Sequence, residues 1–147
     1  MKGVLKMTSC IFCQIIEGAV PSAKIYEDEH VYAFMDIMPT TEGHVLLIPK
    51  KHIENIYNFS EEDAANFFKV APKIANALKA EFRPAGLNLL QNNGAPAGQS
   101  VFHYHMHFIP RYDETDGFDL STWETKQTTY TPEKIQELAD KIKSVLA

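Results

Sequence analysis

Alternation of apolar and polar residues predicts short strands along much of the chain. Two short runs flank the polar turn at 28–30, and a nearly continuous apolar run follows them. A loop at 92–98, rich in asparagine, glycine and alanine, separates two further runs. The predicted strands are Lys24–Glu27, Val31–Asp36, His44–Pro49, Leu87–Gln91 and Val101–Pro110.

Helical periodicity is found in two places. Ser60 followed by Asp63 is typical of a helix start, and apolar residues at helical spacing continue to about Ala80. Pro72 lies inside this stretch and lacks an N–H donor, so the pattern predicts a kink or a break there. Thr131 followed by proline predicts the start of a C-terminal helix. The apolar stripe of that helix is Ile135, Leu138, Ala139, Ile142 and Leu146.

Length and charge limit the classes of function. The chain has 147 residues, which suits a single domain over 1–147, without an internal repeat or a linker. A formal net charge of −5 argues against a polymeric nucleic-acid partner, whereas a single nucleotide is compatible with it. The N-terminal residues lack the apolar core of a signal peptide, and no window is apolar for the length of a membrane span. We therefore expect a cytoplasmic protein without a membrane partner.

Three histidines alternate with apolar residues in the segment HYHMHFIP at 103–110. In a strand, His103, His105 and His107 share one face, and the residues between them face the core. The core-facing residues are Phe102, Tyr104, Met106 and Phe108. A face of three histidines is solvated, binds a metal ion, or is catalytic. Because the segment holds three of the chain's six histidines, catalysis is the sharper interpretation.

The chain's two cysteines, Cys10 and Cys13, form a C-x-x-C pair. Two cysteines make no disulfide framework, so the pair is a redox motif, half of a metal site, or incidental.

Several motifs stand in a fixed order around the histidines. C-I-F-C lies at 10–13, F-M-D-I at 34–37, G-H-V-L-L-I-P-K-K-H at 43–52, N-N-G at 92–94 and G-Q-S-V at 98–101. With H-Y-H-M-H-F-I, this series resembles the histidine-triad (HIT) family of nucleotide hydrolases and transferases, and within it the Hint branch. The match covers about 10–111 and leaves 112–147 as a C-terminal extension.

The resemblance assigns catalytic roles. It implies that His105 attacks the α-phosphorus of a nucleotide derivative, while the carbonyl of His103 fixes the tautomer of the attacking imidazole. His107 and the more distant His44 would stabilise the negative charge on the phosphoryl oxygens. Ser100 would help to protonate a departing amine.

The resemblance also implies a nucleotide pocket. Asp36 would accept the ribose hydroxyls, Asn92 would lie near the sugar and phosphate, and Gln99 would contact the phosphate. An apolar slot would hold the base and favour purines through their larger stacking area. Its implied residues are Ile11, Phe12, Phe34 and Ile37.

A structural zinc ion is implied by comparison with bacterial family members. Its ligands would be two cysteines and two histidines, a set suited to a closed tetrahedral site, and the chemistry itself would need no metal. The implied ligands are Cys10, Cys13, His52 and His103.

The expected fold is an α+β, HIT-like domain with a five-stranded antiparallel sheet, a central helix and a C-terminal helix. The family's homodimer would join two such sheets into one of ten strands. In place of the short tail of eukaryotic Hint proteins, the extension bears Trp123 and a helix, which leaves the leaving-group preference open.

The expected activity is hydrolysis of nucleoside phosphoramidates or related nucleotidyl compounds, with release of a purine nucleoside monophosphate. One rival is dinucleoside polyphosphate hydrolysis, as in the fragile-histidine-triad branch, but that branch has glutamine in place of the third histidine. The presence of His107 and Ser100 favours the Hint branch. Two further rivals are a nucleotide-binding regulator with incidental turnover and a zinc-dependent binding module.

Overall fold

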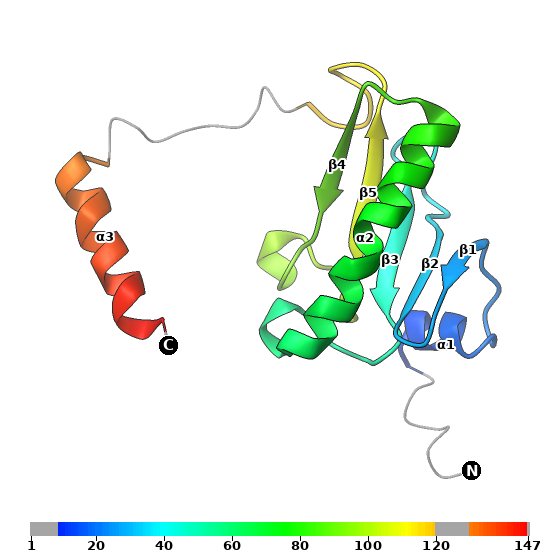
Figure 1. Ribbon diagram of the computed structural model, residues 1–147, viewed down its shortest axis with the longest axis horizontal. Helices are drawn as coiled ribbons and strands as arrows, with labels where there is room; N and C mark the ends of the chain where they lie inside the picture. The colour runs from blue at the N-terminus through cyan, green and yellow to red at the C-terminus, as the bar shows by residue number, and fades with distance from the viewer. Residues whose placement is uncertain (1–8, 120–129, 147) are drawn as a thin grey trace, which may run out of the picture.

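A five-stranded antiparallel sheet forms the centre of the molecule (Figure 1). The structure is a computed structural model that describes residues 9–119 and 130–146. The strand order is β1-β2-β3-β5-β4, so β1 and β4 are the edges. The strands are β1 Lys24–Glu27, β2 Val31–Met35, β3 Val45–Pro49, β4 Gly86–Leu90 and β5 Met106–Arg111. The predicted α+β fold with five antiparallel strands is confirmed.

Helix α2, Glu61–Phe82, covers one face of the sheet (Figure 1). Its cap is the predicted one, since the Ser60 hydroxyl accepts the N–H of Asp63 at 3.0 Å. The helix runs through Pro72 without a break, so of the two predicted outcomes the break is wrong and a kink stays a prediction. The side-chain amide of Asn76 donates to the Pro72 carbonyl at 2.9 Å, and the packed face of the helix compensates for the donor that proline lacks.

A second apolar cluster lies on the opposite face of the sheet, next to a short helix that the sequence pattern does not predict. This helix, α1, spans Ile11–Ile16, and Cys10 is its N-cap. Phe12 and Ile15 pack against Phe34 and the neighbouring residues of β2 and β3. Six residues are too few for helical periodicity to stand out, and tertiary packing stabilises so short a helix.

Strand β5 begins at Met106, five residues later than predicted. The preceding segment, 101–105, is held by other contacts: the N–H of Tyr104 donates to the carbonyl of Ile53 at 2.6 Å. Tyr104, Met106 and Phe108 lie in the core as predicted. Phe102, also predicted to face the core, is 43% exposed because it lies outside the strand.

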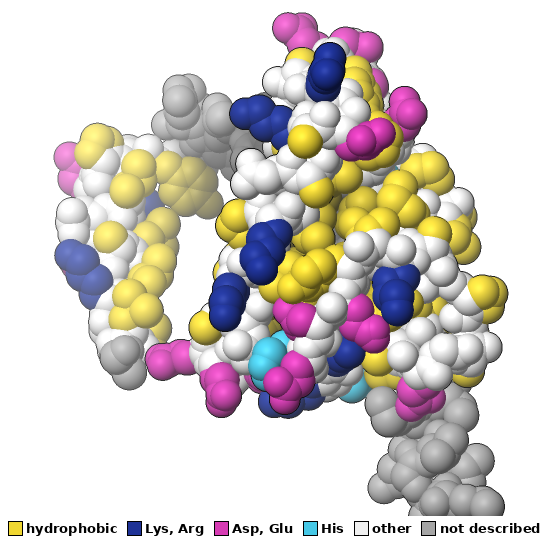
Figure 2. Space-filling view, turned by 45° about the vertical axis from the view of Figure 1, so that its right-hand side comes forward, with side chains coloured by type: hydrophobic (Ala, Val, Ile, Leu, Met, Phe, Trp, Pro, Cys, Tyr) yellow, Lys and Arg dark blue, Asp and Glu magenta, His cyan; other side chains and the backbone are white. Residues whose placement is uncertain are grey.

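The predicted C-terminal helix is confirmed as α3, Pro132–Val145, with the Thr131 hydroxyl accepting the N–H of Lys134. None of its residues is buried, and apolar side chains of this helix are visible at the surface (Figure 2). Trp123 lies outside the described residues. Within the described ranges, no helix is both long enough and apolar enough to span a membrane.

Candidate active site and metal centre

A cavity of about 410 Å³ opens beside the second apolar cluster. Helix α1, the loop before β1, strands β2 and β3, and the residues before and within β5 all contribute to its wall. Its lining residues include Phe12, Ser22, Phe34, Asp36, Ser100, His105 and His107. The fold therefore gathers most of the residues that the sequence singled out.

His105 has the tautomer that a nucleophile needs. Its Nδ1 lies 2.7 Å from the carbonyl oxygen of His103, which can only accept, so Nδ1 carries the proton. The lone pair is then on Nε2, on an imidazole that lines the cavity. Burial lowers the pKa of His105, which keeps this nitrogen unprotonated near neutral pH.

His107 has the opposite tautomer. The backbone N–H of Thr40 donates to Nδ1 of His44 at 2.9 Å, so the proton of His44 is on Nε2. That Nε2 lies 2.9 Å from Nδ1 of His107 and donates to it. The remaining proton of His107 is therefore on Nε2. Burial lowers the pKa of His44 and lowers that of His107 to about 4, so both rings are neutral in this chain of bonds.

Thr40 was not among the predicted residues. It contributes a backbone N–H, which every residue except proline carries, so no side-chain pattern could have indicated it. His44 itself is 3% exposed and is not among the residues that line the cavity. Its contact with His107 gives it a positioning role, and direct stabilisation of charge stays a prediction for it.

Asp36, His44 and His107 form a possible metal cluster by position, because their ligand atoms lie within 4.8 Å of one another. The positions of the protons on the two histidine rings argue against metal binding. A metal on Nε2 of His44 would move the proton of that ring to Nδ1, which faces the N–H of Thr40. Two donors would then face each other, so this group does not fit a metal.

Asp36 and the aromatic residues shape the rest of the cavity. One oxygen of Asp36 accepts the N–H of Met38 at 2.8 Å, and the other lies 3.4 Å from Nε2 of His44. Phe12 packs edge-on against Phe34, with ring centroids 5.6 Å apart. The remaining predicted slot residues, Ile11 and Ile37, also line the cavity, and Ile37 is 89% exposed at its rim.

Asn92 and Gln99 are not among the lining residues. Gln99 is buried, and its amide donates to the carbonyls of Glu54 and Val101 while its oxygen accepts the N–H of Gly94. Asn92 contacts the carbonyl of Gly98 at 3.4 Å. Both side chains hold the loop that carries Ser100, and direct contact with a substrate stays a prediction for them.

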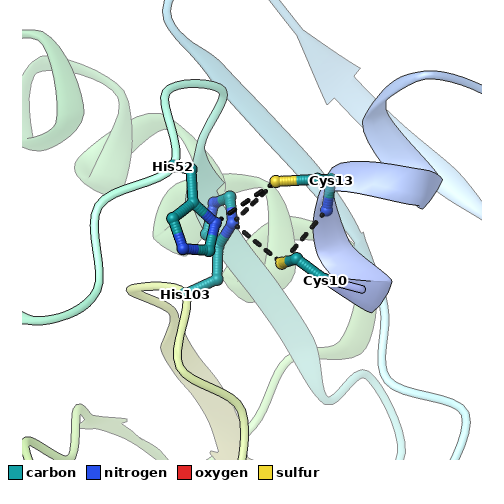
Figure 3. Close-up of side chains that lie close together, drawn as sticks. All are labelled: Cys10, Cys13, His52 and His103. Atoms are coloured by element: carbon teal, nitrogen blue, oxygen red, sulfur yellow. Dashed lines mark hydrogen bonds between the residues drawn. The ribbon is translucent and has the colours of Figure 1, made fainter. Parts of the chain in front are cut away.

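The four predicted metal ligands converge on one point (Figure 3). Cys10 and Cys13 come from the N-terminal end of α1, His52 from the loop after β3, and His103 from the segment before β5. The sulfur of Cys13 lies 3.3 Å from Nδ1 of His52 and 3.5 Å from Nδ1 of His103. The sulfur of Cys10 lies 3.4 Å from the same nitrogen of His103.

These distances fit a tetrahedral zinc site. Zinc bonds of about 2.3 Å to sulfur and about 2.0 Å to nitrogen place those ligand atoms about 3.5 Å apart. Nε2 of His103 donates to the carbonyl of Pro49 at 2.7 Å, so its Nδ1 presents a lone pair to the cluster. Burial and the neighbouring Cys10 raise the pKa of Cys13 to about 12, and a divalent cation would reverse that preference for the thiol.

The family model of the HIT domain matches residues 17–114. The chain belongs to the HIT family. The Protein hit of Bacillus subtilis is 57% identical over 139 residues, which cover 95% of each chain. The adenosine 5'-monophosphoramidase HNT1 of Candida albicans is 39% identical over 143 residues, covering 95% of this chain and 92% of that protein.

Solved structures of HIT proteins have the same fold. A Bacillus subtilis HIT protein superimposes with a TM-score of 0.90 at 57% identity, over 94% of this chain and 97% of the other. A zinc-bound histidine triad protein of Mycobacterium smegmatis superimposes with a TM-score of 0.70 at 31% identity, over 95% and 99% of the two chains.

Proposed function

We propose that this HIT protein hydrolyses nucleoside phosphoramidates, or related nucleotidyl compounds, at the α-phosphorus. The observation that carries the proposal is the fixed tautomer of His105, whose free Nε2 belongs to a ring lining an apolar cavity. Similarity to fungal proteins named adenosine 5'-monophosphoramidase supports the same reaction class. The proposed location is the cytoplasm.

In the first step, Nε2 of His105 attacks the phosphorus and forms a P–N bond, while the bond from phosphorus to the leaving amine breaks. The amine takes a proton, and the hydroxyl of Ser100 in the cavity wall delivers it. Water then attacks the phosphorus, the bond to His105 breaks, and the proton that the attacking water loses returns to the Ser100 oxygen. The product is a nucleoside monophosphate, and His105 returns to its neutral form.

The other groups have supporting roles in this mechanism. The Nε2–H of His107 donates to a non-bridging oxygen as negative charge gathers there. Asp36 accepts the ribose hydroxyls. The slot around Phe12 and Phe34 takes a purine base, whose large face gives the greater stacking contact.

The zinc ligands are assigned a structural role. When bound, zinc supplies a rigid cross-link and no chemistry to the substrate. Cys10 and Cys13 flank the slot residues Ile11 and Phe12, and His103 lies two residues before His105. The cluster would therefore hold the base slot and the nucleophile at a fixed separation.

The test is rapid quench of the protein with adenosine phosphoramidate, followed by intact mass measurement and quantification of AMP. We expect a transient adenylyl adduct on the wild type and neither adduct nor AMP with His105→Asn. Diadenosine polyphosphates, run in parallel, test the rival hydrolase activity. Binding of AMP without an adduct or turnover of any of these compounds would leave the regulator as the better explanation.

A further inference from the structure

The cavity contains one polar side chain that the proposed chemistry does not use. Five of its described lining residues carry polar side chains: Ser22, Asp36, Ser100, His105 and His107. Asp36 and the last three have proposed roles in binding the ribose or in catalysis. Ser22 is on the loop before β1, and no sequence pattern singled it out.

Ser22 is held by a buried tyrosine. Its hydroxyl lies 2.8 Å from the hydroxyl of Tyr32, which is 6% exposed. The ring of Tyr32 lies against Phe34, with centroids 5.9 Å apart, and Phe34 in turn contacts Phe12. The hydroxyl pair therefore borders the aromatic slot proposed for the base.

The sheet register fixes where Ser22 enters the cavity. Lys24 pairs with Phe34, and the N–H of Met35 donates to the carbonyl of Ala23 at 3.0 Å. In an antiparallel pair this register brings the backbone of Ser22 opposite Asp36 at the end of β2, while its hydroxyl bonds back to Tyr32, whose ring lies against Phe34. The catalytic imidazoles approach the cavity from β5 and the segment before it, so Ser22 comes from a different wall.

We propose that the Ser22 hydroxyl, positioned by Tyr32, recognises the substituent at the 6-position of a purine base. This inference rests on the proposed function, and it names the substrate class more closely. A pair of hydroxyls has two protons and uses one between its members, so one donor and several lone pairs remain. Either hydroxyl can be the donor within the pair, and Ser22 can therefore accept from a 6-amino group or donate to a 6-oxo group.

The base is a better partner for Ser22 than the ribose. Asp36 already offers a carboxylate to the ribose, and its Oδ2 lies 3.9 Å from His107, near the proposed phosphate site. The Ser22–Tyr32 pair instead borders the ring of Phe34. A hydroxyl in an otherwise apolar slot discriminates by the hydrogen bond that an analogue fails to make.

The experiment compares kcat/KM for three 5'-phosphoramidates, those of adenosine, inosine and purine riboside, which has hydrogen at the 6-position. We expect the wild type to prefer the first two over purine riboside by about three- to tenfold, the effect of one neutral hydrogen bond. Ser22→Ala should remove this preference while still hydrolysing purine riboside phosphoramidate. Ser22→Thr keeps the hydroxyl and should restore the preference, and Tyr32→Phe should weaken it.

Dissociation constants of the three nucleoside monophosphates give the same ratio without turnover. If no phosphoramidate is hydrolysed but Ser22→Ala removes the preference in binding, the proposed reaction fails and the base recognition holds. An equal fall in kcat/KM for all three compounds in Ser22→Ala would overturn the inference, and so would an unchanged preference among them. If Ser22→Ala instead loses the discrimination between the phosphoramidates of adenosine and 2'-deoxyadenosine, Ser22 contacts the ribose, and this result would also overturn the inference.

Discussion

At the scale of single residues, main-chain groups assign the proton of each histidine in the triad. Carbonyls of Pro49 and His103 accept from His103 and His105, and the N–H of Thr40 acts on His107 through His44. The alternating pattern in the sequence located the triad. The family resemblance implied that the carbonyl of His103 fixes the tautomer of His105. The pattern could not give the tautomers of His103 and His107, because these depend on groups far away in the chain.

His44 offers a direct test of this arrangement. His44→Leu removes the donor to Nδ1 of His107, which frees that ring to rotate or change tautomer. We expect kcat/KM for adenosine phosphoramidate to fall about ten- to hundredfold, the effect of a misplaced donor. His44→Gln has an acceptor oxygen and a donor nitrogen on one amide, so it should retain much of the activity.

Nitrogen-15 NMR of His107 separates positioning from loss of structure. The wild type and His44→Gln should show the proton on Nε2, and His44→Leu should show a mixture of tautomers at an unchanged melting temperature. An unaltered His107 spectrum in His44→Leu, alongside reduced activity, would contradict the positioning role.

At the scale of elements, the sequence located most of the fold and missed what tertiary contacts decide. Caps at Ser60 and Thr131 are local signals, and both helices begin where predicted. Helix α1 has too few residues for a period. The residues of the segment before β5 alternate like those of a strand. The segment instead hydrogen-bonds to the end of β3 and the loop after it, and this outcome depends on residues elsewhere in the chain.

The cluster of cysteines and histidines is the element-scale feature most open to test, since it joins α1 to that segment. Wild-type protein should contain about one zinc ion per chain by mass spectrometry of the metal. Cys13→Ser should lose the ion and about 4 kcal/mol of unfolding free energy, the value for free zinc a thousandfold above its Kd. Chelation of the wild type should reproduce this loss, and the variant should not respond further to a chelator. A metal-free wild type with the same melting temperature would contradict the assignment.

At the scale of the whole molecule, the sheet has an apolar edge. Strand β4 is an edge strand, and on it Leu89 and Leu90 are 50% and 42% exposed. Exposed apolar edge strands tend to pair with another strand. We therefore propose a homodimer in which two β4 strands meet to form a sheet of ten strands.

Sedimentation equilibrium tests this assembly. The wild type should sediment at twice the chain mass of 16.6 kDa, and Leu89→Lys should shift it toward the monomer, because charge on an edge strand opposes pairing. Ile135→Lys on α3 is the matched control, since it places the same charge on an exposed apolar residue that is not part of the sheet, and it should leave the dimer intact. None of the described residues that line the cavity is on β4, so monomeric Leu89→Lys should still bind AMP. A monomeric wild type, or dissociation caused by Ile135→Lys alone, would place the interface elsewhere or remove it.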